Sequence, residues 1–271
     1  MDPELIVAFV ALGAIVGFLA GLLGLGGGMT MVPLLTFVFT RQGFASEHVV
    51  HLAIATATAT ILFTSIASTR EHHKHDAVLW HVVAGMAPGI VVGSFVGPQI
   101  VGTMSTSLLA AFFGVFIAFC ATQAFLDRKP KPSRELPGRG GLFAVGGGIG
   151  LIASMVGAGG AFITVPFMAA CNVKLRNCIA TSAAVGLPVA IAGTISFVLA
   201  GLHQAGLPPW SVGYVYVPAL LAIVIGSVAC APIGARAAHR WPVKALRRAF
   251  ACLLYVMAVY MLWKAWQSAQ V

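Results

Sequence analysis

The chain has 271 residues, of which 59% are hydrophobic and only 8% are charged, and its mean hydropathy is +0.95. Soluble domains carry about 25% charged residues, so this composition excludes a water-soluble globular protein. The net charge of +9 comes from basic residues in short loops between apolar segments, a pattern that reports membrane topology and argues against nucleic-acid binding.

Apolar segments long enough to cross a bilayer recur from one end of the chain to the other. A crossing helix needs roughly 20 apolar residues, and these runs are continuous rather than alternating. We therefore predict an all-α polytopic membrane protein. No Lys or Arg precedes the first run, so we expect it to be retained rather than cleaved as a signal peptide. The runs are Leu5–Leu23, Val49–Thr69, Ala77–Gln99, Thr106–Leu126, Cys178–Leu202, Ser211–Ile233 and Val243–Trp263.

Two glycine-rich stretches resemble each other. "LLGLGGGMTMVPLL" begins at Leu22, and "MVGAGGAFITVPFM" begins at Met155. "IATATATILFTSIAST" from Ile54 likewise resembles "IATSAAVGLPVAIAGT" from Ile179, and Gly93-Ser94 matches Gly226-Ser227. A stretch rich in charge, Pro and Gly, "DRKPKPSRELPGRGG", separates the two sets and has the composition of a linker. We predict a first repeat over residues 1–126, a linker over 127–140 and a second repeat over 141–271.

The basic residues decide how the two repeats are oriented. If each glycine-rich stretch crosses the membrane once, the sixteen Lys and Arg residues divide equally between the two sides. If each stretch enters and turns back, all of them except Arg41 and Lys264 fall on one side, as the positive-inside rule requires. Met29–Thr40 is also only about 18 Å of helix, too short for about 30 Å of hydrocarbon.

The predicted fold is therefore two inverted repeats, each a glycine-broken re-entrant helical hairpin followed by three transmembrane helices. An odd number of crossings per repeat makes the two repeats antiparallel. The excess of Lys and Arg places the linker in the cytoplasm and the N-terminus outside.

The hairpin tips are the candidate substrate site. Glycine permits a turn inside the membrane, and the first turn of the returning helix offers unpaired N–H groups and a positive dipole end to an anion. Inverted-repeat transporters place such tips near the bilayer midplane. Neighbouring hydroxyls add further donors. The candidate residues are Gly24, Gly26, Gly27, Gly28, Thr30, Thr56 and Thr58 in the first repeat, and Gly157, Gly159, Gly160, Thr164, Thr181 and Ser182 in the second.

Two alternatives apply to these residues. The glycines also fit close helix packing of the small-xxx-small kind. The Ser and Thr hydroxyls also fit hydrogen bonds to carbonyls of their own helix.

The acidic residues argue against a cation substrate and against an enzyme. All of them lie at segment ends or in loops, whereas a cation pathway or an acid–base site requires carboxylates inside the membrane. We expect no cofactor and no metal site. The histidine-rich stretch "TREHHKHDAVLWH" has no tetrahedral ligand spacing. It is either a loop facing lipid headgroups or a proton-exchange site formed by Glu71, Asp76 and His72.

The chain resembles the sulfite exporter TauE/SafE family of membrane transporters. The resemblance rests on "GLLGLGGGMTMVPLL", "AIATATATILFTSIAS" and "DAVLWHVVAGMAPGIVVGSFVG", and on weaker copies after the linker. It implies a secondary transporter of small sulfur-containing anions, sulfite or an organosulfonate, in the bacterial inner membrane. Ala161 in place of a third glycine, and Val185–Pro188, depart from the pattern. A passive anion channel on the same scaffold is the alternative, and the oligomeric state, a homo-oligomer included, is left open.

Overall fold

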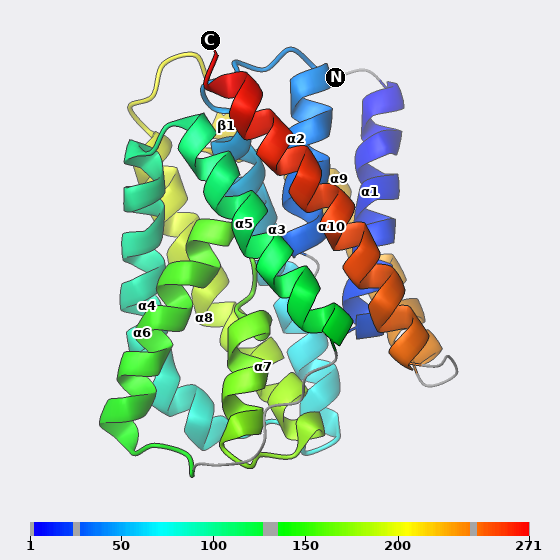
Figure 1. Cartoon of the computed structure of the whole chain (residues 1–271), viewed down its shortest axis with the longest axis vertical. Helices are drawn as coiled ribbons and strands as arrows, with labels where there is room; N and C mark the ends of the chain where they lie inside the picture. Colours follow the sequence, from blue (N-terminus) through cyan, green and yellow to red (C-terminus); the bar gives the residue numbers. More distant parts are fainter. Residues whose placement is uncertain (1–2, 24–27, 127–134, 239–242, 271) are drawn as a thin grey trace.

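The computed structural model describes residues 3–23, 28–126, 135–238 and 243–270. Apart from a two-stranded antiparallel hairpin, β1 (Ser211–Val212) and β2 (Val215–Tyr216), all regular structure in these ranges is helical (Figure 1), which confirms the predicted all-α class. The helices are α1 (Pro3–Leu23), α2 (Gly28–Arg41), α3 (Val49–Lys74), α4 (Trp80–Thr103), α5 (Thr106–Leu126), α6 (Arg139–Val156), α7 (Ala161–Ala170), α8 (Leu175–Gly201), α9 (Val217–Ala238) and α10 (Val243–Ser268).

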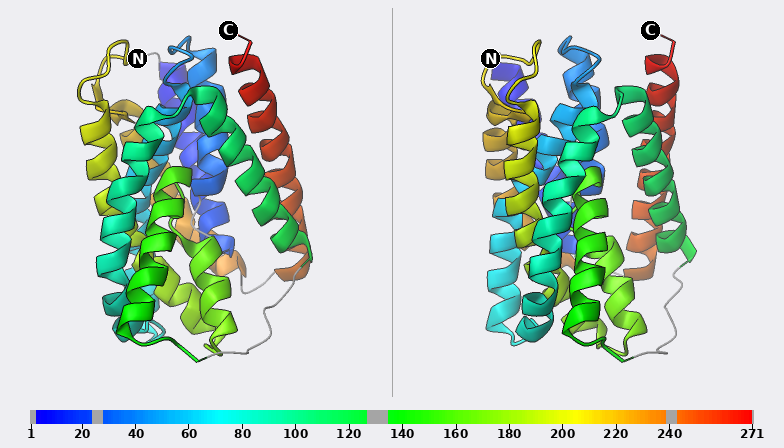
Figure 2. Two further views of the ribbon diagram at one scale, coloured as in Figure 1. Left: turned by 60° about the vertical axis from the view of Figure 1, so that its left-hand side comes forward. Right: turned by 90° about the vertical axis from the view of Figure 1, so that its left-hand side faces the viewer.

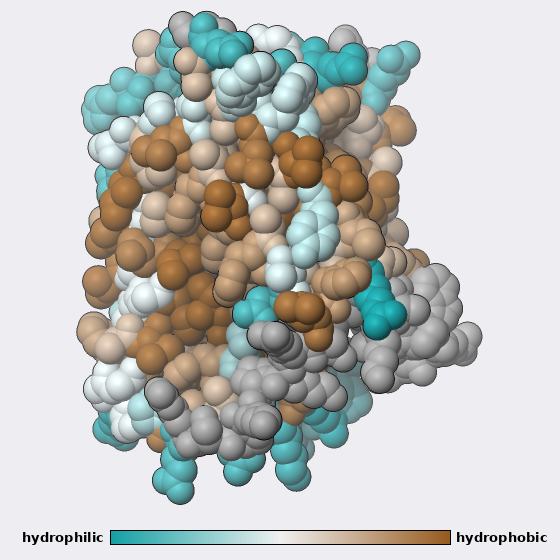
Figure 3. All heavy atoms as spheres, viewed as in Figure 1, coloured by the Kyte–Doolittle hydropathy of each residue, from teal (hydrophilic) through white to brown (hydrophobic). Residues whose placement is uncertain are grey.

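The molecule has the surface of a membrane protein. Brown, hydrophobic side chains cover the middle of the face in Figure 3, and hydrophilic ones gather at its two ends. Within the described ranges, six helices are long and apolar enough to cross a membrane: α3, α4, α5, α6, α8 and residues 248–268 of α10. The chain is therefore a multi-pass membrane protein.

Both glycine-rich segments return to the end of the molecule at which they began. Helix α1 runs inward from the end where the C-terminus lies, and α2 runs back to it (Figure 1). Helix α6 rises from the opposite end, where α3 joins α4, and α7 returns to that end (Figure 2). Length alone counts α6 among the crossing helices and leaves α9 among the shorter ones, so the path of the chain, rather than helix length, identifies the hairpins. Helix α6 also begins two residues before the predicted boundary at Gly141.

Glycines bring two helix pairs into backbone contact. A Cβ atom on Gly17 of α1 would lie under 3.0 Å from the Ser227 carbonyl of α9, and one on Gly150 of α6 would lie as close to the Ile90 carbonyl of α4. No residue with a side chain fits at either position. Close packing of the small-xxx-small kind, which was an alternative for the glycines, thus exists between α1 and α9 and between α4 and α6.

These contacts occur in matched pairs. In the first pair, a Cβ on Gly13 of α1 would touch the Ile223 backbone of α9, and one on Gly146 of α6 would touch the Met86 backbone of α4. In the second pair, a Cβ on Gly226 of α9 would touch the Val10 backbone of α1, and one on Gly89 of α4 would touch the Phe143 backbone of α6. One constant offset relates the α1 residues to those of α6, and another relates the α4 residues to those of α9. The contacts equate Gly226 with Gly89, so the sequence match of Gly226 with Gly93 is one helical turn out of register.

The threonines of the two Ile-Ala-Thr motifs form a further matched pair. The Thr56 hydroxyl accepts a hydrogen bond from the Tyr216 N–H (3.1 Å), directly before α9, and the Thr181 hydroxyl accepts one from the Leu79 N–H (3.0 Å), directly before α4. Each motif therefore caps the start of a helix from the other half of the chain.

We expect the glycine contacts to limit stability. Gly146→Ala places a Cβ under 3.0 Å from the Met86 carbonyl, whereas Gly148→Ala, in the same helix, meets no atom within 4 Å. Overpacking costs about 1–3 kcal/mol, so Gly146→Ala should lower the thermal unfolding temperature in detergent. Gly148→Ala should leave it unchanged or raise it, because alanine favours helix. Equal unfolding temperatures would contradict the close approach.

The two threonine caps should be equivalent in stability. Thr56→Val and Thr181→Val each remove the acceptor of a backbone N–H, a loss of about 1–3 kcal/mol in the free energy of unfolding. Thr60→Val is the matched control, since the Thr60 hydroxyl donates to the Thr56 carbonyl within its own helix. Denaturant unfolding of the three variants measures the difference, and a control as unstable as the other two would show that the caps are unimportant.

Candidate functional site

The tip of the α6–α7 hairpin is built from two glycines in the left-handed region. Helix α6 ends at Gly157 (φ 64°), whose N–H donates to Ser154, while the next N–H, of Ala158, donates to Ala153. This Schellman arrangement satisfies the last carbonyls of α6. Gly160 (φ 77°) then starts α7. Only glycine adopts such angles without strain, which explains the spacing of the motif.

The start of α7 leaves hydrogen-bond donors over. The Gly160 carbonyl accepts from the N–H groups of Ile163 and Thr164. Among the described residues, none accepts from the N–H groups of Gly159, Gly160, Ala161 or Phe162, and no side chain caps the helix. The positive end of the helix dipole lies at the same point. The tip therefore offers several donors, and the neighbouring carbonyls of Ala153, Ser154 and Gly160 already have partners.

The tip of the α1–α2 hairpin meets the second tip. Gly28, the first residue of α2, is buried, and a Cβ there would lie under 3.0 Å from the Gly157 carbonyl. Thr30, in the first turn of α2, is 1% exposed. The other predicted residues of this tip, Gly24, Gly26 and Gly27, lie outside the described residues.

Helices α3 and α8 form the walls around the tips. The position of a Gly157 Cβ is 3.0 Å from the Ile54 carbonyl of α3, and that of a Gly159 Cβ is 3.5 Å from the Ile61 side chain and 3.9 Å from Gly186 of α8. Ser182 lies one turn before Gly186 on the same face of α8. It is 1% exposed, and its hydroxyl has no hydrogen-bond partner among the described residues.

Most of the predicted hydroxyls already have partners inside the protein. Thr58 donates to the Ile54 carbonyl (2.8 Å) and Thr164 to the Gly160 carbonyl (2.9 Å), each within one turn. Thr56 and Thr181 accept the backbone N–H groups described above. Ser182 is thus the predicted side chain with an uncommitted hydroxyl.

The predicted proton-exchange residues lie away from the tips. Glu71 and His72 are in the last turn of α3, and Asp76 (φ 49°) follows in the connection to α4. The Glu71 carboxylate pairs with the Lys74 ammonium (3.1 Å) and lies 3.7 Å from the His75 ring. All three side chains are more than half exposed. Proton coupling through Glu71, Asp76 and His72 stays a prediction. Across the described ranges no group of three His, Cys, Asp or Glu side chains suits a metal ion.

Sequence reasoning did not assign Gly186 of α8 and its neighbour Ser65 of α3 to the site. Gly186 faces Gly159, and the position of a Gly186 Cβ is 2.6 Å from the Ser65 hydroxyl of α3. Gly186 belongs to the stretch Val185–Pro188, which breaks the hydroxyl pattern of the first repeat. A side chain at position 186 would therefore require the Ser65 hydroxyl to rotate away.

Comparisons with known proteins agree with one another. Residues 9–261 match the family described as sulfite exporter TauE/SafE. A probable membrane transporter protein of Haemophilus influenzae is 34% identical over 93% of this chain and 96% of its own. One of Methanocaldococcus jannaschii is 27% identical over 93% and 94%, and one of Xylella fastidiosa is 25% identical over 99% of both chains. No solved structure matches the chain significantly.

The match extends over both hairpins and the helices around them, and it confirms the resemblance seen in the motifs. The chain belongs to the sulfite exporter TauE/SafE family of membrane transporters.

Proposed function

We propose that this protein is a secondary transporter that moves a small sulfur-containing anion, sulfite or an organosulfonate, across the bacterial inner membrane by alternating access. The observation that carries the proposal is the meeting of the two hairpin tips at Gly28 and Gly157, beside the free N–H groups at the start of α7 and the unpaired Ser182 hydroxyl.

Electrostatics favours an anion at this point. Uncommitted N–H and O–H groups donate hydrogen bonds, and the helix start carries about half a positive charge. No Asp or Glu is buried in the described part of the chain. A cation would therefore find no buried carboxylate in the described residues around the tips.

The matched contacts support two inverted repeats, α1–α5 and α6–α10. Packing of α1 on α9 corresponds to packing of α6 on α4, and the Thr56 cap corresponds to the Thr181 cap. The two hairpins begin at opposite ends of the molecule (Figures 1 and 2), as inversion requires. In such folds, exchange of conformation between the repeats opens the central site alternately to the two sides.

The basic residues support the orientation. Arg41 ends α2 and Lys264 is near the end of α10, and these two helices end where α4 joins α5 (Figure 1). Arg70 and Lys74 are in the last turns of α3, and Lys174 and Arg176 are at the start of α8, at the opposite end of the molecule. The positive-inside rule places that opposite end, and the linker, in the cytoplasm, with the N-terminus outside.

A change at Gly160 tests the tip directly. Gly160→Val places a β-branched residue at φ 77° and fills the start of α7. We expect sulfite flux into proteoliposomes to fall at least tenfold, since tip geometry positions the anion donors. Gly206→Val is the matched control, because Gly206 has φ 80° in a loop with no atom within 4 Å of its Cβ position. Normal flux through correctly folded Gly160→Val protein would rule out the tip as the site, and unsaturable currents would favour a passive channel.

Ser182 should contribute to anion affinity. Ser182→Ala removes a buried donor, and hydrogen bonds to charged groups contribute about 1.5–3 kcal/mol, so the KM for sulfite should rise about tenfold or more. Ser227→Ala is the control, because Ser227 is fully buried and its hydroxyl donates to Val224 of its own helix (3.2 Å). An unchanged KM in saturable transport would place Ser182 outside the binding site.

A further inference from the structure

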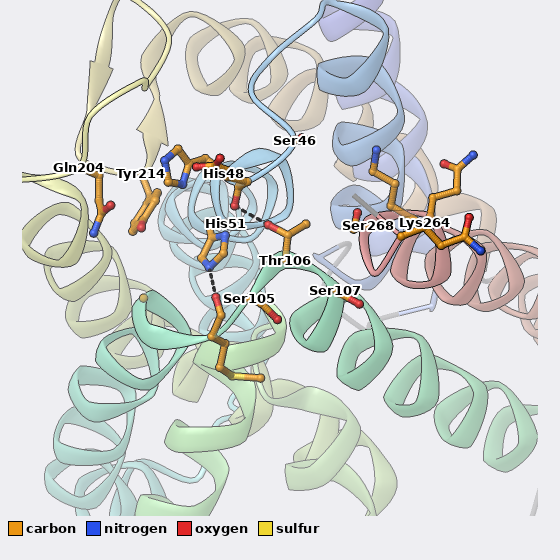
Figure 4. Close-up of a pocket in the computed structure, with 15 residues that line it drawn as sticks. Ser46, His48, His51, Ser105, Thr106, Ser107, Gln204, Tyr214, Lys264 and Ser268 are labelled. Carbon is orange, nitrogen blue, oxygen red and sulfur yellow. Dashed lines mark hydrogen bonds between the residues drawn. The ribbon is translucent and has the colours of Figure 1, made fainter.

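A second polar region lies far from the hairpin tips, at the end of the molecule where α4 joins α5. It is a cavity of about 790 Å³ between the start of α3, the β1–β2 hairpin, the first turn of α5 and the last turns of α10 (Figure 4). Hydroxyl and amide side chains supply most of its lining, and its cationic side chain is Lys264.

Lys264 is the unusual member of this lining. It is 7% exposed and lies in the part of α10 after Arg248, which has no other charged residue. In the ranges that the structure describes, Lys264 takes part in neither of the two ion pairs, both of which involve Glu71. Glu47 is the carboxylate of the lining, and it is exposed and unpaired with Lys264. A mostly buried lysine that lines a cavity and has no carboxylate partner favours an anion as the partner of its ammonium group.

The first turn of α5 adds donors beside Lys264. The Ser107 hydroxyl donates to the Ala265 carbonyl (2.7 Å), which holds the start of α5 against the turn of α10 that carries Lys264. Ser105 accepts the Leu108 N–H (3.3 Å), and the Thr106 hydroxyl donates to the Glu47 carbonyl. The backbone N–H groups of Thr106 and Ser107 have no such acceptor among the described residues, and they lie at the positive end of a 21-residue helix.

His51 and Tyr214 give the opposite wall a fixed shape. The Nε2–H of His51 donates to the carbonyls of Val101 (3.0 Å) and Met104 (3.1 Å), and the ring stacks on Tyr214 at 5.2 Å. His51 is 3% exposed, and its Nδ1 has no partner among the described residues. Burial raises the pKa of the Tyr214 phenol, so this ring stays neutral.

We propose that this cavity is a vestibule that binds a sulfur oxyanion on the outer face, with the Lys264 ammonium and the first N–H groups of α5 as donors. The inference rests on the proposed transport function and adds an outer binding step to it. The volume corresponds to on the order of 25 waters at about 30 Å³ each, so the anion binds there with much of its hydration. The lining suits the oxygens of sulfite and of a sulfonate alike, and the two probes below distinguish them.

The test is calorimetric titration of the purified full-length protein with sodium sulfite and, separately, with sodium isethionate. Loss of one charge-assisted contact corresponds to about a tenfold change in Kd. We expect that weakening in Lys264→Gln, and retained binding in Lys264→Arg. Arg41→Gln is the matched control, since Arg41 is an exposed cation at the same end of the molecule and outside the cavity. Weakening of only one probe identifies the inorganic or the organic oxyanion as the ligand.

Further variants separate this inference from the proposed function. Lys264→Met replaces Lys264→Gln if the latter does not fold. In Gly160→Val, flux should be lost while Lys264-dependent binding remains. Binding that is absent in the wild type, or equal in wild type and both Lys264 variants, overturns the vestibule and leaves transport standing if wild-type flux is saturable. Lys264-dependent binding without any wild-type flux overturns the transport function instead.

Discussion

The structure depends on one constraint, that backbone leaving a helix inside a membrane must find its hydrogen-bond partners within the protein. At the α6–α7 tip the constraint is met unequally. Left-handed glycines at 157 and 160 let the end of α6 satisfy its carbonyls through the N–H groups of Gly157 and Ala158. Nothing in the described chain plays the same part for the first N–H groups of α7. These N–H groups, at the positive end of α7, are the donors on which the proposed anion site rests.

Glycine has a second role in this structure, in the helix pairs that hold the hairpins in place. A short re-entrant hairpin buries little surface of its own, so the helices around it must hold it in place. Glycines such as Gly17 and Gly150 allow α1 to lie backbone to backbone against α9, and α6 against α4. Contacts this close leave no room for a Cβ atom at these glycines. The tips thus rest on two tightly fitted helix pairs.

The sequence predicted the helical class and the glycine turn between α6 and α7, because hydropathy and glycine clusters are local properties. It could not assign the hydroxyls. A threonine in an apolar helix reads the same whether it bonds to its own helix, as Thr58 does, or caps a helix more than a hundred residues away, as Thr56 does. Lys264 was counted only as a topology charge, since its burial arises from α5 packing on α10. The register of α4 against α9 likewise depended on contacts between distant segments.

The difference in charge between the two regions has a consequence for transport. A carrier must capture its anion from dilute solution and then release it, so tight binding at the central site would slow turnover. In the proposed vestibule, a full charge at Lys264 beside a cavity large enough for water would suit capture of a hydrated anion. The tips offer helix ends, each with about half a charge, and the Ser182 hydroxyl. In the proposed transport cycle, partial charges would compensate an anion that has shed its water without the strength of an ion pair, and the anion would then leave when the opposite side opens.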